Sequence, residues 1–353
     1  MGALSDITVI DLTASFWASA GTALLADFGA DVMQVEEVKG GKKEERLPGW
    51  DLLARRNKRR AMVADDAGLR ATIEEADVFA TDLSFPELEA RGLDYDTLAA
   101  GKAALIYACA SGFGPEGSDR DLPALDELAA ARTGMMPVLP QPGEPPVYTG
   151  AGQMYSSVML ALGVMLALHH LEETGEGQRV DVSLFSGNMY GASLDIQAYL
   201  AIGGERLLHP ISRLDAGNPM SGPSYPSSDG RWVTLTMPDT DRYWPRFAPV
   251  VGLDPADPRF DTHDKRCEAN RLELIQYLDG AFCRQPAVHW KQQIVELGLS
   301  GDVIEAYDYP ANDEEARRNR YVIDVEGSDS IGLPIYMSET PAAMPAEARA
   351  VAR

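Results

Sequence analysis

Cysteine and positive charge are both scarce in this sequence. Its 353 residues include only Cys109, Cys267 and Cys283, and no two stand at the Cys-x-x-Cys spacing of a metal or redox site. A sparse, odd set of cysteines is typical of a reducing compartment, so we expect a cytoplasmic location. Lysine and arginine number 31 against 54 acidic residues, which gives a formal charge of −23. This balance argues against nucleic acid or an anionic membrane surface as the main partner.

Long apolar runs and leader-like segments are also lacking. Residues 1–12 show no basic stretch followed by an apolar segment, so no signal peptide is predicted. The most apolar run, residues 158–168, is too short to span a bilayer and is interpreted as a core helix. Met154, Met159 and Met165 in this region are expected to fill the core. None of the five histidines has a partner at metal-ligand spacing, so no metal site is predicted.

The N-terminal part alternates between strand and helix patterns. Short apolar runs predict strands at residues 8–12, 32–35, 61–63, 78–80, 105–109 and, later, 179–184. Helical patterns follow at residues 18–28, 68–76 and 153–171, with a further helix to about residue 200. This alternation is typical of a mostly parallel sheet covered by helices, so we expect an α/β fold.

The pattern changes after residue 208. Residues 209–228 are rich in Gly, Pro, Ser and Asn and indicate a boundary. A strand at 232–237 and helices around 241–251, 270–284 and 287–297 then predict a smaller α+β unit. Strand-like pieces follow in the tail, at residues 321–324 and 335–337.

One basic island interrupts the acidic chain. It carries a local excess of positive charge and contains Lys39, Lys42, Lys43, Arg46, Arg55, Arg56, Lys58, Arg59 and Arg60. The island follows the first βαβ pattern, where open sheets bind ligands, and could therefore hold a polyanionic small molecule. A solvated surface loop with salt bridges explains the same residues equally well, and both interpretations stay open here.

Two further features could carry chemistry. Residues 112–117 match G-x-G-x-x-G, but Pro115 and the loop that follows disfavour a nicotinamide or flavin site. Asp126 follows Pro123, which suits the first turn of a helix, and a carboxylate at a helix start is stabilised as the anion. Asp126 could simply complement the helix dipole, or it could be a nucleophile beside an acyl thioester held by the glycine-rich loop.

A series of short motifs runs along the chain in a fixed order. They are Ile10-Asp11-Leu12, Leu25-Ala26-Asp27-Phe28-Gly29-Ala30-Asp31-Val32, Asn57-Lys58-Arg59, Gly92-Leu93-Asp94-Tyr95, Ser111-Gly112-Phe113-Gly114-Pro115, Asp126, Thr174-Gly175-Glu176-Gly177-Gln178, Asp229-Gly230 and Trp290. In this order and at this spacing the sequence resembles the class III CoA-transferases, the family of formyl-CoA and carnitine CoA-transferases. The resemblance extends from Leu4 to about Tyr336.

The resemblance implies an architecture. The large domain is Rossmann-like, a smaller α+β domain is inserted into it, and two chains interlock as a dimer. We therefore assign residues 1–208 to the large domain, residues 209–318 to the smaller domain with its linkers, and residues 319–353 to a tail that returns to the large domain. A homodimer is expected, with a heterodimer of paralogous subunits as the alternative.

The resemblance also implies a mechanism and a site. Asp126 would attack an acyl-CoA thioester to give a mixed anhydride and then an aspartyl-CoA thioester, from which a carboxylic acid takes the CoA. CoA and acyl-CoA are substrates, and no tightly bound cofactor is implied. A loop at Gly217 and Asn218 would exclude water. The positions that match the CoA site are Ser15, Phe16, Trp17, Val63, Leu83, Ser111 and Gly112, with Lys58 and Arg59 as candidate phosphate ligands.

Two departures from the family pattern define the alternatives. Related racemases place a histidine before the aspartate and a second acid downstream, whereas Leu125 and Gln153 stand in these regions here. A 2-methylacyl-CoA racemase or epimerase is therefore disfavoured. The positions where relatives bind CoA phosphates through basic residues are here Glu37, Asp66, Ala90 and Ser111. A weakly catalytic or non-catalytic subunit of a hetero-oligomer is the second hypothesis.

Overall fold

The computed structural model describes residues 2–37, 48–203, 212–325, 327–343 and 349–350. The chain divides into two compact units. Unit 1 comprises Met1–Met136, Val147–Leu208 and Asp313–Arg353, and unit 2 comprises Pro137–Pro146 and His209–Asn312.

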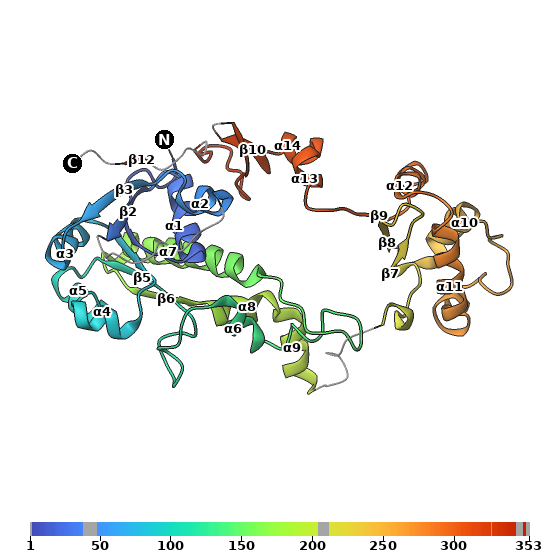
Figure 1. Cartoon of the computed structure of the whole chain (residues 1–353), viewed down its shortest axis with the longest axis horizontal. Coiled ribbons are helices and arrows are strands. Elements are labelled where there is room, and N and C mark those ends of the chain that lie inside the picture. The colour runs from blue at the N-terminus through green and yellow to red at the C-terminus, as the bar shows by residue number, and fades with distance from the viewer. Residues whose placement is uncertain (1, 38–47, 204–211, 326, 344–348, 351–353) are drawn as a thin grey trace. The chain divides into compact units, whose positions relative to one another are not determined.

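A parallel sheet forms the centre of unit 1 (Figure 1). Its strands, in chain order, are β1 (Thr8–Leu12), β2 (Asp31–Glu37), β3 (Arg59–Val63), β4 (Val78–Thr81), β5 (Ile106–Ser111), β6 (Arg179–Ser183) and β12 (Arg349–Ala350). The spatial order is β12-β3-β2-β1-β4-β5-β6, and every adjacent pair is parallel. Apart from the two-residue β12, this is the 3-2-1-4-5-6 order of the doubly wound fold, so the α/β prediction is confirmed.

Helices cover both faces of this sheet, because successive strand residues point to opposite sides. Val9 and Val78 belong to one core, which includes α1 (Phe16–Asp27) and α7 (Ala151–Thr174). Ile10 and Phe79 belong to the other core. Its helices are α3 (Asp66–Glu75), α4 (Phe85–Arg91) and α5 (Tyr95–Gly101). Burial on both faces explains why the central strands β1, β4 and β5 are mostly apolar in sequence.

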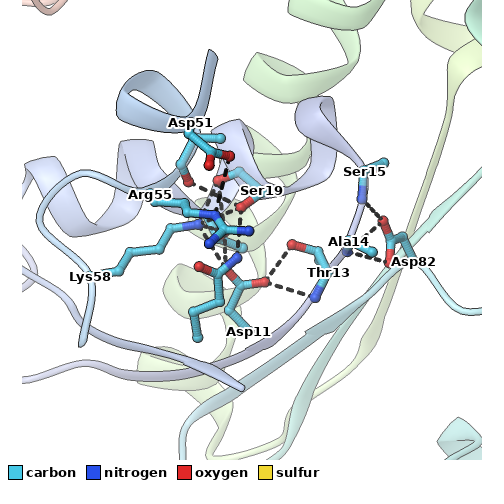
Figure 2. Close-up of polar contacts among 12 residues, drawn as sticks. Asp11, Thr13, Ala14, Ser15, Ser19, Asp51, Arg55, Lys58 and Asp82 are labelled. Carbon is cyan, nitrogen blue, oxygen red and sulfur yellow. Dashed lines mark hydrogen bonds and ion pairs between the residues drawn. The ribbon is translucent and has the colours of Figure 1, made fainter. Parts of the chain in front are cut away.

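The carboxyl ends of β1 and β4 lie side by side, at the point where the strand order reverses. Asp82, just after β4, accepts hydrogen bonds from the backbone N of Ala14 at 2.9 Å and of Ser15 at 2.6 Å, as Figure 2 shows. Burial raises the pKa of the Asp82 carboxyl group, and the hydrogen bonds from Ser15 and Ala14 oppose this shift. Asp82 therefore fixes the turn from which α1 begins.

A buried ion pair lies close to this turn (Figure 2). The Nζ atom of Lys58 lies 2.7 Å from Oδ2 of Asp11 in β1, and both side chains are fully buried. The same amine donates to the Ser19 carbonyl oxygen at 2.7 Å and to Oγ1 of Thr22 at 2.8 Å, both in α1. Burial lowers the pKa of Lys58, while the Asp11 carboxylate acts in the opposite direction. The network joins β1, α1 and the start of β3.

Unit 2 combines a small antiparallel sheet with three main helices (Figure 1). The sheet order is β7-β8-β9, with β7 (Ser221–Pro226), β8 (Trp232–Thr236) and β9 (Gly301–Ile304). The helices are α10 (Thr240–Val250), α11 (Arg271–Phe282) and α12 (Ala287–Glu296), with short helical turns at Arg213–Asp215, Lys265–Ala269 and α13 (Tyr309–Asn312). Phe282 lies at the centre of the core, with ring centroids 5.1 Å from Tyr225 and 4.6 Å from Trp290. The α+β character matches the expectation from sequence.

The C-terminal part of unit 1 is a short helix and a hairpin. These are α14 (Glu314–Arg318) and the antiparallel pair β10 (Val322–Val325) and β11 (Ser328–Ile331). The strand predicted at residues 335–337 is wrong, since these residues have no regular structure and Tyr336 is almost fully exposed. Apolar side chains form a strand only where a neighbouring strand accepts their backbone hydrogen bonds.

The predicted core helix, α7, is buried along one side only. Leu160 and Val164 are buried against α1 and the sheet, whereas Leu162 and Leu166 are exposed. By length and composition alone α7 could cross a membrane, and 44% of its most apolar window is buried inside the protein.

The prediction for the methionines of α7 is correct in part. Met159 packs against the core. The prediction that Met154 and Met165 fill the core is wrong, because both lie on the exposed side of the helix.

Candidate active site

Asp126 is the first residue of α6 (Asp126–Ala131), so the prediction of an acid at a helix start is confirmed. Pro123 lies before the helix, and the prediction that it occupies the first turn is wrong. The Asp126 side chain has little solvent contact, with 6% of the residue exposed, and it lines a pocket of about 390 Å³. The lining residues are Ser15, Phe16, Trp17, Trp50, Ala124, Leu125, Asp126, Glu127, Tyr148, Gln153 and Leu184.

Two neutral side chains hold the Asp126 carboxylate. Oη of Tyr148 donates a 2.6 Å hydrogen bond to Oδ2, and Nδ2 of Asn188 donates a 2.7 Å hydrogen bond to Oδ1. Within the described ranges Asp126 forms no ion pair. An ionised carboxylate has about four acceptor positions, so one bond to each oxygen orients the group and leaves lone pairs available.

Tyr148 is suited to remain a donor in this position. Its burial is the main cause that raises the pKa of the phenol, and the Asp126 carboxylate beside it adds to the shift. The phenol therefore keeps its proton through the neutral range and stays bonded to the carboxylate.

Glycines let two helices meet closely beside Asp126. A Cβ atom on Gly152 in α7 would overlap the side-chain amide of Asn188, which belongs to α8 (Leu184–Gly191). In the reverse direction, a Cβ atom on Gly187 in α8 would overlap Oγ of Ser156 in α7. Asn188, Tyr148 and Trp50 were not predicted from the sequence as site residues, whereas Gln153 was noted only as a departure from the racemase pattern. The only signal in the sequence was the presence of glycines inside helical patterns, where they are unfavourable unless a close approach requires them.

Gly112 brings the end of β5 against the segment that leads to Asp126. A Cβ atom on Gly112 would lie 3.0 Å from Cα of Ala124 and 3.1 Å from the carbonyl oxygen of Pro123. Neither Gly112 nor residues 113–117 of the glycine-rich loop belong to the pocket lining. No helix begins between the end of β5 and Asp126, so the loop lacks the strand–loop–helix geometry of a dinucleotide fingerprint, as predicted from the sequence.

A family profile described as CoA-transferase family III matches residues 4–350 of the sequence. The chain belongs to this family. It is therefore a transferase that moves CoA between acids, with CoA thioesters as substrates.

Individual members of the family show the extent of the similarity. The chain is 28% identical over 363 residues to the cinnamoyl-CoA:phenyllactate CoA-transferase of Clostridium sporogenes, covering 95% of this chain and 87% of that one. It is 28% identical over 362 residues to the acetyl-CoA:oxalate CoA-transferase of Acetobacter aceti, and the match covers 96% of this chain and 90% of that one. The fold matches the crystal structure of a CAIB/BAIF family protein from Brucella suis with a TM-score of 0.83 at 23% sequence identity. The match covers 99% of this chain and 95% of that chain.

In this family III transferase, most of the residues matched to a CoA site lie at the carboxyl edge of the sheet. Ser15 follows β1 and lines the Asp126 pocket with Phe16 and Trp17 at the start of α1. The remaining four matched residues lie outside the pocket lining. They are Val63 at the end of β3, Leu83 after β4, Ser111 at the end of β5, and Gly112. This edge is where open parallel sheets bind ligands.

Lys58 and Arg59 do not fit the role of free phosphate ligands. Lys58 is buried, and its amine is already bonded to Asp11 and to α1. Arg59 begins β3, at the opposite edge of the sheet, where it forms a bidentate pair with Asp31 at 2.6 Å for both bonds. Both residues belong to the basic island in sequence, whereas their ion-pair partners, Asp11 and Asp31, come from β1 and β2.

The rest of the described part of the basic island is also engaged in ion pairs. Arg55 and Arg60 lie 3.3 and 3.5 Å from Glu36, and Arg56 forms a buried pair with Asp27 at 2.8 Å. These arginines therefore fit the interpretation of the basic island as a segment held by salt bridges. Lys39, Lys42, Lys43 and Arg46 lie outside the described residues.

The predicted cover loop belongs to unit 2. Nδ2 of Asn218 lies 3.3 Å from the carbonyl oxygens of both Met237 and Pro238, and its Oδ1 accepts a 2.8 Å hydrogen bond from the Met220 backbone N. The loop at Gly217 and Asn218 is thus braced by its own unit, and its role as a cover stays a prediction. Among the described residues, no group of three or more His, Cys, Asp and Glu side chains is arranged to hold a metal ion.

Proposed function

We propose that this transferase moves CoA from an acyl-CoA thioester to a free carboxylic acid, with Asp126 as the nucleophile. The observation that carries the proposal is the shielded Asp126 carboxylate, held in a pocket by two neutral donors, Tyr148 and Asn188. Neutral donors orient the carboxylate without the strong charge compensation of a lysine or arginine, which would reduce its nucleophilicity.

The proposed reaction has four balanced steps. An Oδ atom of Asp126 attacks the thioester carbonyl, the C–S bond breaks, and a mixed anhydride and CoA thiolate form. The thiolate attacks the Asp126 carbonyl carbon, which releases the first acid and gives an aspartyl-CoA thioester. The acceptor carboxylate attacks this thioester to give a second anhydride and thiolate. The thiolate then attacks the acceptor's acyl carbon, which forms the new acyl-CoA and restores the Asp126 carboxylate.

The start of α1 is placed to assist these steps. Ser15, Phe16 and Trp17 line the pocket, and the first-turn N–H groups of a helix have no partners within the helix. Such N–H groups can stabilise the oxyanion that forms when a thioester or anhydride carbonyl is attacked. Asp82 fixes the preceding turn through Ala14 and Ser15, so the donors are held in place before substrate binds.

The pocket favours CoA transfer over racemisation. Leu125 and Gln153 line the pocket beside Asp126, at positions where the related racemases carry groups that transfer protons. A leucine cannot exchange a proton, and a glutamine amide is a very weak acid and base. Glu127 is the other acid of the described lining, but it follows Asp126 directly in the chain and stands at neither of these two positions.

We further propose that two copies of the chain form a dimer. Exposed apolar side chains gather on α7, α8 and α9 (Ser193–Ile202), and they include Leu162, Leu166, Tyr190, Leu194, Leu200 and Ile202. Leu194 is 88% exposed. Apolar patches of this kind are rare on monomers and typical of obligate interfaces. Light scattering should report a dimer that Leu194→Glu weakens.

The alternative is a subunit that relies on a paralogous partner for nucleotide binding. The described lining of the Asp126 pocket contains no lysine, arginine or histidine, which favours this alternative. Calorimetry of the isolated full chain with CoA distinguishes a transferase that acts alone from a subunit that depends on a partner. Binding supports the transferase acting alone, with CoA placed along the sheet edge near Val63, Leu83 and Ser111. Absence of heat at millimolar CoA supports the partner-dependent subunit.

The nucleophile is tested by mass spectrometry after incubation with acyl-CoA and hydroxylamine, which traps an acylated or thioesterified aspartate as a hydroxamate. We expect modification at Asp126, its loss in Asp126→Ala, and its retention in Glu127→Gln, the neighbouring acid of the same pocket. A wild-type protein that turns over substrate without modification at Asp126 would contradict the assignment.

A further inference from the structure

The two carboxylate oxygens of Asp126 have different surroundings. Oδ2 accepts the 2.6 Å hydrogen bond from Tyr148, which is itself a lining residue of the Asp126 pocket. Oδ1 accepts the 2.7 Å hydrogen bond from Asn188, which belongs to α8 and is not a lining residue. The oxygen beside the pocket wall, where a thioester would bind, is therefore Oδ2.

The donor to Oδ1 is held in place by its own helix and by α7. The second N–H of the Asn188 amide donates to the Leu184 carbonyl oxygen, one turn earlier in α8, at 2.9 Å. A Cβ atom on Gly152 in α7 would overlap the amide, so the backbone of α7 packs directly against it. Both N–H bonds of the amide thus have fixed acceptors before any substrate binds, which is the condition for a preorganised donor.

The four proposed steps treat the two oxygens differently. The oxygen that attacks the acyl-CoA becomes the bridging atom of the anhydride and leaves with the first acid. The other oxygen stays on Cγ of Asp126 as the carbonyl oxygen of the anhydride and of the aspartyl-CoA thioester. Negative charge develops on this second oxygen when the CoA thiolate attacks Cγ in the second step and when the acceptor carboxylate attacks Cγ in the third. A donor about 2.7–3.1 Å away stabilises that charge.

We propose that Oδ2 of Asp126 attacks the acyl-CoA and that Asn188 stabilises the oxyanion that forms on Oδ1 each time Cγ is attacked. This assignment rests on the proposed function of Asp126 as the nucleophile. Asn188 serves the second and third steps. The first-turn N–H groups of α1 serve the first and fourth, where the charge develops on an acyl oxygen of the substrate. The bond that positions the resting carboxylate is thus also the bond that stabilises the charge.

The test isolates the attack on Cγ. The full-length protein is incubated, without an acceptor acid, with acetyl-CoA, succinyl-CoA or 3-phenylpropanoyl-CoA radiolabelled in the CoA part, until labelling of the protein no longer increases. It is then separated from small molecules. The thioester that remains on Asp126 carries only CoA, so the next step is independent of the donor. Hydroxylamine attacks Cγ, gives the hydroxamate and releases CoA, and the rate of this release is measured.

Removal of the Asn188 amide should slow the release of CoA. We expect Asn188→Ala to release CoA about 100-fold more slowly than the wild type, as is typical when one oxyanion donor is lost. Gly152→Ala, which displaces the same amide, should slow the release by a similar factor. Tyr148→Phe should release CoA at nearly the wild-type rate, because sulfur has replaced Oδ2, the atom to which Tyr148 donates.

Asn319→Ala is the matched control for the loss of an asparagine amide. Nδ2 of Asn319 donates to the Glu315 carbonyl oxygen, four residues earlier, at 2.9 Å and to the carboxylate of the same residue at 2.8 Å. These are the same two kinds of bond that Asn188 makes, at an exposed position outside the pocket lining. The thioester of Asn319→Ala should release CoA at the wild-type rate.

Infrared difference spectra of the same thioesters give a second readout. The C=O stretch of the thioester should move to higher frequency in Asn188→Ala, because the carbonyl oxygen loses a hydrogen bond. It should keep its wild-type frequency in Tyr148→Phe and in Asn319→Ala.

The outcomes separate the role of Asn188 from the function of Asp126. If Tyr148→Phe slows the release and shifts the carbonyl frequency while Asn188→Ala changes neither, the attacking oxygen is Oδ1 and the role of Asn188 is overturned, with Asp126 still the nucleophile. Equal effects in the two variants would overturn that role as well. Labelled CoA on another residue, or no label with any of the three donors, would overturn the proposed function and the role of Asn188 together.

Discussion

The space occupied by the Asn188 side-chain amide is the space that a Cβ atom on Gly152 would need. The same amide donates to Oδ1 of Asp126 at 2.7 Å and to the Leu184 carbonyl oxygen at 2.9 Å. A glycine in α7 thus permits the hydrogen bond that orients the proposed nucleophile, although Gly152 itself is not a lining residue of the pocket. Gly152 and Asn188 are positioning residues in this arrangement.

Gly152→Ala should lower kcat by about 10- to 100-fold, because displacing Asn188 removes a hydrogen bond to a charged group, a loss of roughly 1.5–3 kcal/mol. Asn188→Ala should lower kcat by a similar factor. The double variant should be no slower than either single variant, because both changes remove the same bond. Steady-state kinetics with one donor and one acceptor measures all three.

Gly101→Ala is the control for this series, since a Cβ atom on Gly101 would meet nothing within 4 Å. It should keep wild-type kcat. Multiplicative losses in the double variant would show that Gly152 and Asn188 act independently and would refute the coupling.

Tyr148→Phe should lower kcat by about 10- to 100-fold, because it removes the 2.6 Å hydrogen bond to Oδ2 of Asp126. The raised pKa of Tyr148 adds a second expectation. Its phenol keeps its proton beyond the ordinary pKa of about 10, so any fall in kcat between pH 7 and pH 10 comes from another group. The pH profiles of wild type and Tyr148→Phe should therefore differ in height and share their alkaline limb. A limb present only in the wild type would assign the ionisation to Tyr148.

The parts of the fold that sequence could predict are those where local pattern and burial agree. β1 was placed correctly because a buried parallel strand is a short, mostly apolar run. β6 was placed within one residue because Val180 and Val182 alternate with polar residues, which is typical of a half-buried strand such as one at the edge of a sheet. β7 was missed because it contains Gly222 and Pro223, which are unfavourable in central strands but tolerated at the edge position it occupies.

The active-site side chains divide in the same way. Asp126 could be proposed as the nucleophile because it belongs to a series of motifs in a fixed order along the chain, and its role stays a prediction. Its partners Tyr148 and Asn188 come from 22 and 62 residues further along the chain, and only the packing of α7 and α8 brings them together. Lys58 shows a related limit of the sequence, and its role as a phosphate ligand stays a prediction. Its neighbours in sequence are basic, whereas its actual partner, Asp11, is buried in another strand.

Lys58→Met should destabilise unit 1 by about 3–5 kcal/mol, because it leaves the buried Asp11 carboxylate without its partner. Denaturant unfolding measures the loss. The combined Lys58→Met and Asp11→Leu variant should recover much of it, since two apolar groups of similar size can replace a buried pair. Arg59→Met is the matched control, because its exposed pair with Asp31 should contribute only about 0–1 kcal/mol. A Lys58→Met protein of normal stability that binds CoA at least 10-fold more weakly would instead identify Lys58 as a phosphate ligand.

Asp229→Asn should destabilise unit 2 at neutral pH, and the difference from wild type should shrink in acid. The Asp229 carboxylate accepts hydrogen bonds from Oγ of Ser227 at 2.6 Å, from Arg231 at 3.1 Å and from the Ala287 backbone N at 3.3 Å, which joins the β7–β8 turn to the start of α12. These bonds, led by the one from Ser227, lower the pKa of Asp229 to about 2. Because the folded-state pKa lies below the unfolded value of about 3.9, the stabilisation is complete above pH 4 and is lost as pH falls toward 2. Urea unfolding of both proteins at pH 7 and pH 3, followed by tryptophan fluorescence, measures the change. A stability difference that is equal at the two pH values would show that Asp229 acts through packing rather than through its charge.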